Sequence, residues 1–351
     1  MKKISGVKKI AVLRSNAIGD YVVCLPALHA LRAAYPQAEI TLLGQHWHAE
    51  FLKNRPGPID RVEVVPCMKG IYAKGGADPD SPEAVENFFG RMVKEEFDLA
   101  VQLYGGGRYS NPFVKRLGAG CAIGMKSPDA ETLDRWVPYV FYHYEVLRYL
   151  EVVALAGAKP VELEPKIPVL KEDIFEALPF LPQAPFAILH PGASDPRRRW
   201  PAEKFAAVGD ALKKQGVQVM ITGSREERPI ARTVRGLMKT EALNRAGDFS
   251  LKGLIAALRK ASLVVSNDTG PLHLARATGT PTVGIYWIGN ALNASPLSVT
   301  RNRTHISWRL NCPVCGNNCI QSDCPHKDSF VADVRREDVI HSALQSLRMF
   351  T

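Results

Sequence analysis

The stretch Ser266–His273 (Ser-Asn-Asp-Thr-Gly-Pro-Leu-His) has the residue types of a turn that binds an anion. It follows a short apolar run, and its informative members are Asp268, Thr269, Gly270, Pro271 and His273. The acid and the threonine favour a helix N-cap, and proline suits a first helical turn. Glycine permits close approach of a ligand, and the helix N-terminus attracts phosphate. The histidine lies about one turn further on and could face the same point. The alternative is an ordinary capped strand-to-helix turn.

A second candidate is the basic run Arg197–Arg199. It follows the expected strand Phe186–His190 and a turn that contains Gly192 and Ser194. Guanidinium groups at this place could neutralise a diphosphate. A solvated basic loop is the alternative interpretation.

The third candidate is Asp20, which follows Gly19 directly and opens an expected helix that runs through Arg32. An acid in the first turn can simply complement the helix dipole. The functional alternative is a general base that removes a proton from an acceptor hydroxyl.

Alternating strands and helices position these candidates, and they predict an α/β fold with two doubly wound parallel-sheet domains. The expected strands are Lys8–Arg14, Glu39–Leu43, Arg61–Val65, Phe97–Leu103, Phe186–His190, Val217–Thr222, Leu263–Ser266 and Thr282–Tyr286. Ligands of such sheets bind beyond the carboxyl ends of the strands, where all three candidates fall. Two such domains facing a cleft suit an enzyme with two substrates.

The expected domain boundaries follow the proline content. An amino-terminal Rossmann-like domain should span residues 1–165, and a proline-rich linker 166–185, with a short strand around Ile167–Leu170. A second Rossmann-like domain should span 186–330 and carry a cysteine-rich loop at 312–326. The chain should end with a helix in 331–351, over about Asp333–Leu347.

The composition bounds the class of protein. The chain has 351 residues, of which 46% are hydrophobic and 23% charged, and a formal net charge of +10. No apolar run is long enough to span a bilayer, and the run at Ile10–Leu13 is too short for a signal peptide. We therefore expect a cytoplasmic protein. The positive charge favours anionic partners, namely phosphorylated substrates, nucleic acid or an anionic membrane face.

The whole chain resembles glycosyltransferase family 9, the bacterial lipopolysaccharide heptosyltransferases. The stretches that carry the resemblance are Ser15–Asp20, His190–Ser194, Arg198–Pro201 and Ser266–His273, in the family's order and at comparable spacing. The resemblance implies the two-domain GT-B fold. It also implies an inverting, metal-independent transfer of a sugar, typically heptose from ADP-heptose, to a lipid-linked acceptor of the lipopolysaccharide core.

The resemblance also implies roles for individual residues. Asp20 matches the proposed catalytic base, and Arg198 a basic position that is lysine in better-known members and contacts the donor phosphates. The donor-binding positions are Gly192, Ser194, Asp268, Thr269, Gly270 and His273. The amino-terminal domain would bind the acceptor, and the carboxyl-terminal domain would bind the nucleotide sugar. The enzyme would work at the cytoplasmic face of the inner membrane, with peripheral contact.

The cysteines gather near the end of the chain. Cys312, Cys315, Cys319, Cys324 and His326 offer four thiols and an imidazole. A structural zinc site is one interpretation, although the spacing differs from paired C-x-x-C knuckles. A structural loop with free thiols is the other. No cofactor is expected for catalysis.

Two other functions remain open. A nucleotide-sugar epimerase could use the same fold. A basic nucleic-acid-binding protein is the non-enzymatic alternative, but no recognisable reading module is present and aromatic residues do not interleave with the basic runs. For a phosphorylated lipid-linked acceptor, the candidate contacts are Arg108, Lys115, Arg116, Lys126 and Arg135, for each of which a solvated face is the alternative.

Overall fold

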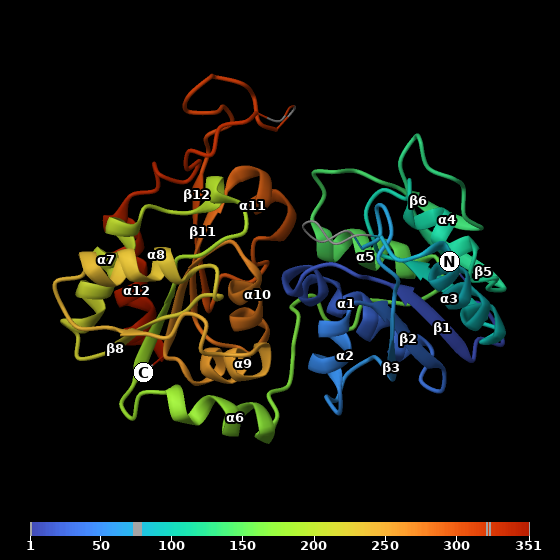
Figure 1. Ribbon diagram of the computed structural model, residues 1–351, viewed down its shortest axis with the longest axis horizontal. Coiled ribbons are helices and arrows are strands. Elements are labelled where there is room, and N and C mark those ends of the chain that lie inside the picture. Colours follow the sequence, from blue (N-terminus) through green and yellow to red (C-terminus); the bar gives the residue numbers. More distant parts are fainter. Residues whose placement is uncertain (1, 73–78, 321, 323, 351) are drawn as a thin grey trace. The chain divides into compact units, whose positions relative to one another are not determined.

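A computed structural model describes residues 2–72, 79–320, 322 and 324–350. The chain divides into two compact units, Met1–Pro165 and Lys166–Thr351. In Figure 1 the first unit runs from blue to green and the second from green to red. Among the described residues, no helix is both long and apolar enough to cross a bilayer.

The first unit contains a six-stranded sheet in the order β3-β2-β1-β4-β5-β6, with each neighbouring pair parallel. This is the strand order of a dinucleotide-binding Rossmann domain. Its strands are β1 (Lys9–Leu13), β2 (Glu39–Gly44), β3 (Arg61–Val64), β4 (Leu99–Gln102), β5 (Cys121–Lys126) and β6 (Arg135–Pro138). The central strands are almost wholly buried because helices cover both faces of a parallel sheet.

The helices of this unit are α1 (Ile18–Ala34), α2 (His46–Leu52), α3 (Pro82–Lys94), α4 (Ser110–Lys115) and α5 (Glu145–Ala154). One hydrophobic core lies between the helices α3 and α4 and one face of the sheet. It includes alternate residues of the strands, such as Ala11 and Leu13 of β1. Ile10 and Val12 are also buried and face the other side, since side chains alternate along a strand. Helices α1 and α5 pack against each other.

The second unit repeats this topology with the order β12-β11-β10-β7-β8-β9. All pairs are again parallel. The strands are β7 (Phe186–His190), β8 (Gln218–Ile221), β9 (Leu243–Asn244), β10 (Leu263–Asn267), β11 (Thr282–Trp287) and β12 (Asn302–Ser307). Counted from the first strand of each sheet, both units have the order 3-2-1-4-5-6. The α/β class and the GT-B arrangement of two doubly wound sheets are therefore confirmed.

The helices of the second unit are α6 (Lys171–Ala177), α7 (Ala202–Lys213), α8 (Arg228–Leu237), α9 (Leu251–Lys260), α10 (Gly270–Ala277), α11 (Ile288–Ala294) and α12 (Arg336–Phe350), with short 3₁₀ turns at Leu178–Phe180 and Pro196–Arg198. A core formed by α7, α8 and α12 covers one face of the sheet (Figure 1). Trp200 is fully buried there, and its indole nitrogen donates to the Val334 carbonyl at 3.0 Å.

The segment predicted as a linker differs from the expectation. Ile167–Leu170 forms no strand, and residues 171–177 form the helix α6, which packs against α9. The Ile167 N–H instead donates to the Ala277 carbonyl at 3.0 Å. The prolines at 165 and 168 favour a linker in the sequence, so the helix was not expected. Its first turn is stabilised by Asp173, whose carboxylate accepts from the N–H of Leu170. The terminal helix starts at Arg336, three residues later than expected.

Each sheet reverses its winding between two neighbouring strands, β1 and β4 in the first unit and β7 and β10 in the second. Leu13 pairs in register with Gln102, and Ser266 with His190. The turns that follow these strands therefore begin side by side. This is the place where open α/β sheets bind their ligands.

Candidate active site

The two turns at the β7/β10 switch point are joined by Asn267, the last residue of β10. Its side-chain amide donates to the Pro191 carbonyl at 2.8 Å, and its oxygen accepts from the Trp200 N–H at 3.0 Å. One fully buried amide thus holds the turn after β7 and the residue that closes the arginine run. Its hydrogen bonds fix the positions of the charged side chains on both turns.

Asp268 lies at the centre of the charged group. Arg198 Nη1 is 3.4 Å from its Oδ2 and 3.3 Å from its backbone oxygen. His273 Nε2 is 3.2 Å from its Oδ1. Only 4% of the Asp268 side chain is exposed. Oδ1 is buried and accepts no aligned hydrogen bond from the described residues.

The charges around Asp268 keep it ionised. Burial raises the pKa of Asp268, but His273 and the guanidiniums of Arg198 and Arg276 lower it, and the lowering prevails. His273 Nδ1 lies 3.3 Å from Arg276 Nη1. Because a guanidinium can only donate, this Nδ1 must accept, and in a neutral ring Nε2 then carries the proton that faces Asp268.

Three adjacent arginines have different environments. Arg197 binds Asp195 through Nε and Nη2, at 3.0 and 2.7 Å. Arg199 Nε donates to the Ala193 carbonyl at 2.9 Å. Arg198 instead reaches the Asp268 turn, and its Nη2 donates to Ser194 Oγ at 3.1 Å. Its side chain is 23% exposed, much like the 22% of Arg197, so its contact with the turn after β10 is what distinguishes it within the run.

Helix α10 starts at Gly270, with Thr269 as an extended N-cap residue and Pro271 in the first turn. The Thr269 side chain caps no helix N–H in the described part of the chain, which differs from the expected capping role. The first N–H groups of a helix lack intrahelical acceptors. Pro271 has no N–H, and the Leu272 N–H donates to the Thr269 carbonyl at 3.0 Å. The Gly270 N–H and the Thr269 hydroxyl are therefore the groups of this helix start that can bind a ligand together.

Gly192 lies against an acid that the sequence analysis missed. A Cβ at position 192 would overlap the carboxylate of Glu227, which accepts from the Ser224 N–H at 2.8 Å. His190 Nε2 lies 3.7 Å from Glu227 Oε2, and burial lowers the pKa of His190 despite this acid. A side chain at position 192 would therefore require the Glu227 carboxylate to move away from the Ser224 N–H.

Asp20 belongs to the first unit and starts α1. Its Oδ2 accepts from the Ala17 N–H at 3.2 Å, so it has the helix-start role that was the alternative interpretation. Its Oδ1 lies 3.2 Å from Arg14 Nη2, and 37% of its side chain is exposed. Arg14 is buried and donates to the Leu103 carbonyl, and its guanidinium lies over the Tyr149 ring. The structure thus holds an accessible carboxylate in a fixed orientation beside a buried cation.

Sequence reasoning did not single out four residues that position these groups, namely Arg14, Glu227, Asn267 and Arg276. A signal existed for two of them. Arg276 stands three residues after His273, a spacing at which helical side chains meet. Asn267 lies inside the stretch Ser266–His273, whose residue types predict an anion-binding turn. Arg14 and Glu227 become recognisable only through tertiary contacts.

The basic residues expected to contact an acceptor have partners within the protein. Arg108, Lys115 and Arg116 pair with Asp129, Glu131 and Glu86. Arg135 donates to the Leu155 carbonyl, and Lys126 lies over the Trp136 ring. The three ion pairs are solvent-exposed and therefore weak, so an anion could compete for them, but they do not form a free cationic surface.

Two parallel Rossmann-like sheets of identical winding in one chain are the two domains of the GT-B fold. The profile of glycosyltransferase family 9 (heptosyltransferase) matches residues 87–321, more than half of the chain. The chain belongs to this family and is a glycosyltransferase. The matched range includes Arg198 and His273 but not Asp20.

Individual relatives agree. The lipopolysaccharide core heptosyltransferase OpsX of Haemophilus influenzae is 24% identical over 304 residues, covering 82% of each chain. Lipopolysaccharide heptosyltransferase 2 of Escherichia coli K12 is 24% identical over 303 residues, covering 83% of this chain and 86% of the relative. A solved family 9 structure from Veillonella parvula gives a TM-score of 0.77 at 21% identity over 97% of both chains. The ADP-heptose heptosyltransferase II of E. coli gives 0.74 at 20% identity, over 97% of this chain and 99% of that one.

Proposed function

We propose that this glycosyltransferase transfers a heptose from ADP-heptose to a lipid-linked, phosphorylated saccharide of the lipopolysaccharide core. The single observation that supports a nucleotide-sugar donor is the charged group formed by Arg198, Asp268 and His273 at the β7/β10 switch point. Relatives named as lipopolysaccharide heptosyltransferases, similar over more than four fifths of the chain, support heptose and the acceptor class.

In the proposed reaction the acceptor hydroxyl oxygen bonds to the anomeric carbon while the bond from that carbon to the diphosphate oxygen breaks. Asp20 accepts the hydroxyl proton as general base, and the configuration at the anomeric carbon inverts. The leaving diphosphate gains negative charge. Arg198 and the N–H group of Gly270 would stabilise that charge, so we propose that the transfer step needs no metal ion.

The other donor-binding positions have distinct proposed tasks. Asp268 would orient the guanidinium of Arg198 towards the donor and would not contact the phosphates, because a carboxylate would repel them. Ser194 and Thr269 offer hydroxyl groups beside the guanidinium and the helix start. Gly192 lets the backbone of its turn approach the donor, and His273 holds Asp268 in place.

We also propose that the enzyme meets its lipid-linked acceptor at the cytoplasmic face of the inner membrane by peripheral contact. The formal net charge of +10 supports attraction to an anionic surface. Sedimentation with anionic and neutral lipid vesicles tests this contact. Binding to anionic vesicles should fall as salt is raised, and equal binding to both kinds would contradict it.

Thermal melting with ADP, UDP, GDP and CDP, each with and without Mg²⁺, tests the proposed donor. A ligand that binds only the folded state raises the melting temperature by mass action. We expect ADP to give the largest shift, with no dependence on Mg²⁺. A larger shift with another nucleotide would exclude ADP-heptose as the donor. If no nucleotide shifted the melting temperature, the proposed donor site would be wrong.

Transfer itself is tested with ADP-heptose and a heptose-deficient lipopolysaccharide acceptor. We expect ADP release to depend on the acceptor and the acceptor to gain one heptose in mass. Release of nucleotide and a free altered sugar without acceptor would indicate an epimerase.

A further inference from the structure

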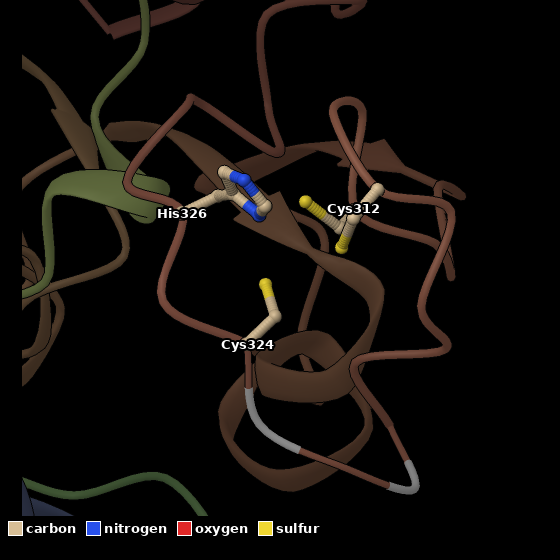
Figure 2. Close-up of side chains that lie close together, drawn as sticks. Cys312, Cys324 and His326 are labelled. Carbon is tan, nitrogen blue, oxygen red and sulfur yellow. The ribbon is translucent and has the colours of Figure 1, made fainter.

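The segment after β12 brings thiols and an imidazole together. One ligand atom from each of Cys312, Cys315, Cys324 and His326 lies within 4.8 Å of all the others. Figure 2 shows the sulfur atoms of Cys312 and Cys324 and the ring of His326 facing a shared space. Side chains from both ends of a loop converge here, so the loop is arranged around this point.

The first two cysteines lie in a tight turn. The Gly316 N–H donates to the Cys312 carbonyl at 3.0 Å, and Gly316 has a φ of 75°, which favours glycine. The Val314 N–H points at Cys312 Sγ at 3.5 Å. Asn311 and Asn318 pair across the base of the turn. A C-x-x-C turn of this kind places two sulfur atoms on one side and supplies an N–H to a thiolate.

His326 supplies a second, independent observation. Its Nδ1 is buried and has no hydrogen-bond partner among the described residues. Buried polar atoms are almost always paired, so an unpaired ring nitrogen on a member of this group requires an explanation. A metal ion in the shared space provides one, since imidazole nitrogen and thiolate sulfur are the ligands that zinc prefers.

We propose that Cys312, Cys315, Cys324 and His326 bind a structural zinc ion. Sulfur atoms on a tetrahedral zinc lie about 3.8 Å apart, because each Zn–S bond is about 2.3 Å. Small side-chain rotations bring the observed group, with a largest separation of 4.8 Å, to this spacing. Three thiolates and one imidazole complete a closed tetrahedral site, which leaves no position for a substrate.

Cys319 lies beside this site. Its Sγ is 3.7 Å from Cys324 Sγ and 3.4 Å from the Asn317 carbonyl oxygen. It does not belong to the group of four in which all ligand atoms are mutually close. Of the five residues that the sequence offers as ligands, Cys319 is therefore the one that we place outside the coordination sphere. It serves as the matched control in the test.

The zinc would support the arginine turn of the proposed donor site, and this part rests on the proposed function. Just after His326, the Ser329 hydroxyl donates to the Arg199 carbonyl at 2.6 Å. The Phe330 N–H donates to the Arg197 carbonyl at 2.7 Å. A metal that closes the cysteine loop therefore fixes the segment that holds the backbone on both sides of Arg198.

The test is the metal content of the full chain, expressed with zinc in the medium and purified without chelator. We expect about one equivalent of zinc per chain by mass spectrometry of the elements. Cys312→Ser, Cys324→Ser and His326→Ala should each lose most of it, whereas Cys319→Ser should retain it. Titration of the wild type with a mercurial should release zinc as thiols are modified, and this readout does not depend on the folding of any variant.

Three outcomes would overturn the proposal. They are wild-type protein without bound metal and with freely titratable thiols, iron in place of zinc, and loss of zinc in Cys319→Ser equal to that in Cys312→Ser. None of these depends on nucleotide binding. The melting experiment with ADP, made on zinc-loaded wild type, decides the proposed function separately.

Discussion

Arg198 Nη1 and Asp268 Oδ2 form an ion pair at 3.4 Å between the turns that follow β7 and β10. Asp268 is buried and Arg198 is accessible, so the pair presents one guanidinium edge while the acid fixes its orientation. A guanidinium has five donors, and the contacts to Asp268 and Ser194 leave others for a ligand. The protein thus holds a preoriented cation at a switch point, where the leaving diphosphate of the proposed reaction would require one.

Replacing Arg198 tests this role. We expect Arg198→Ala to lower kcat/KM for transfer about 100-fold, because one donor group to the developing charge is lost. Arg198→Lys keeps the charge but not the planar fork, and should lower kcat/KM about 10-fold. Steady-state kinetics with varied donor measures both. Arg232→Ala, at an exposed position of α8, is the matched control and should leave kcat/KM unchanged. Wild-type kinetics in Arg198→Ala would contradict the assignment.

Asp20→Asn tests the general base. The amide keeps the size of the side chain and can still accept from the Ala17 N–H, but it cannot take a proton. We expect the transfer rate to fall about 10²- to 10⁴-fold. The melting shift with ADP should stay unchanged, since ADP binding is assigned to the second unit. Glu86→Gln, an exposed acid paired with Arg116, is the control. If Asp20→Asn turned over at the wild-type rate, Asp20 would have only its helix-start role.

Asp268→Asn should destabilise the second unit at neutral pH by about 2 kcal/mol, because it leaves the guanidinium of Arg198 without its buried partner. The pKa of Asp268 is lower in the folded protein than its ordinary value. Ionised Asp268 therefore stabilises the fold above about pH 4, and this contribution is lost as pH falls through the lower, folded pKa. Urea unfolding of wild type and Asp268→Asn at several pH values should show a difference that shrinks below about pH 4. A difference independent of pH would contradict the ionic contribution.

His48 of α2 makes folding of the first unit sensitive to mild acid. Burial, together with the charge of Arg14, lowers the pKa of His48 to about 3, although the Gln45 N–H donates to its Nδ1. The unfolded chain takes up this proton near pH 6.5 and the folded chain does not. Stability due to neutral His48 is therefore complete above about pH 6.5 and falls by at most about 1.4 kcal/mol per pH unit as pH is lowered.

His48→Asn tests this dependence, because the amide oxygen can replace Nδ1 as acceptor but does not titrate. The free energy of unfolding of the variant should fall less steeply than that of wild type between about pH 6.5 and pH 4.5. His341→Asn, at an exposed position of α12, is the control and should keep the wild-type slope. Equal slopes for His48→Asn and wild type would show that His48 is not protonated on unfolding.

The sequence by itself determined the fold class and the stretches that form the site. Alternating apolar runs such as Leu263–Ser266 specify buried parallel strands, because few other structures bury them on both faces. Turn residues at Gly192 and Gly270 mark the strand ends locally. The sequence analysis missed four strands. The edge strands β6 (Arg135–Pro138) and β9 (Leu243–Asn244) are short and partly exposed, and their pairing comes from neighbours in the sheet. The other two are β5 (Cys121–Lys126) and β12 (Asn302–Ser307), which have six residues each.

Only the tertiary structure decided which charges meet. Arg198 and Asp268 are far apart in the chain, and the register of β7 with β10 brings their turns together. Sequence cannot separate Arg198 from Arg197, whose guanidinium binds Asp195. It also cannot show which side chains among Cys312, Cys315, Cys319, Cys324 and His326 lie mutually close, because this depends on how the loop folds. The local sequence pattern determines the helices and strands and where they end. Which charged side chains become partners depends on distances that arise only when the strands pair.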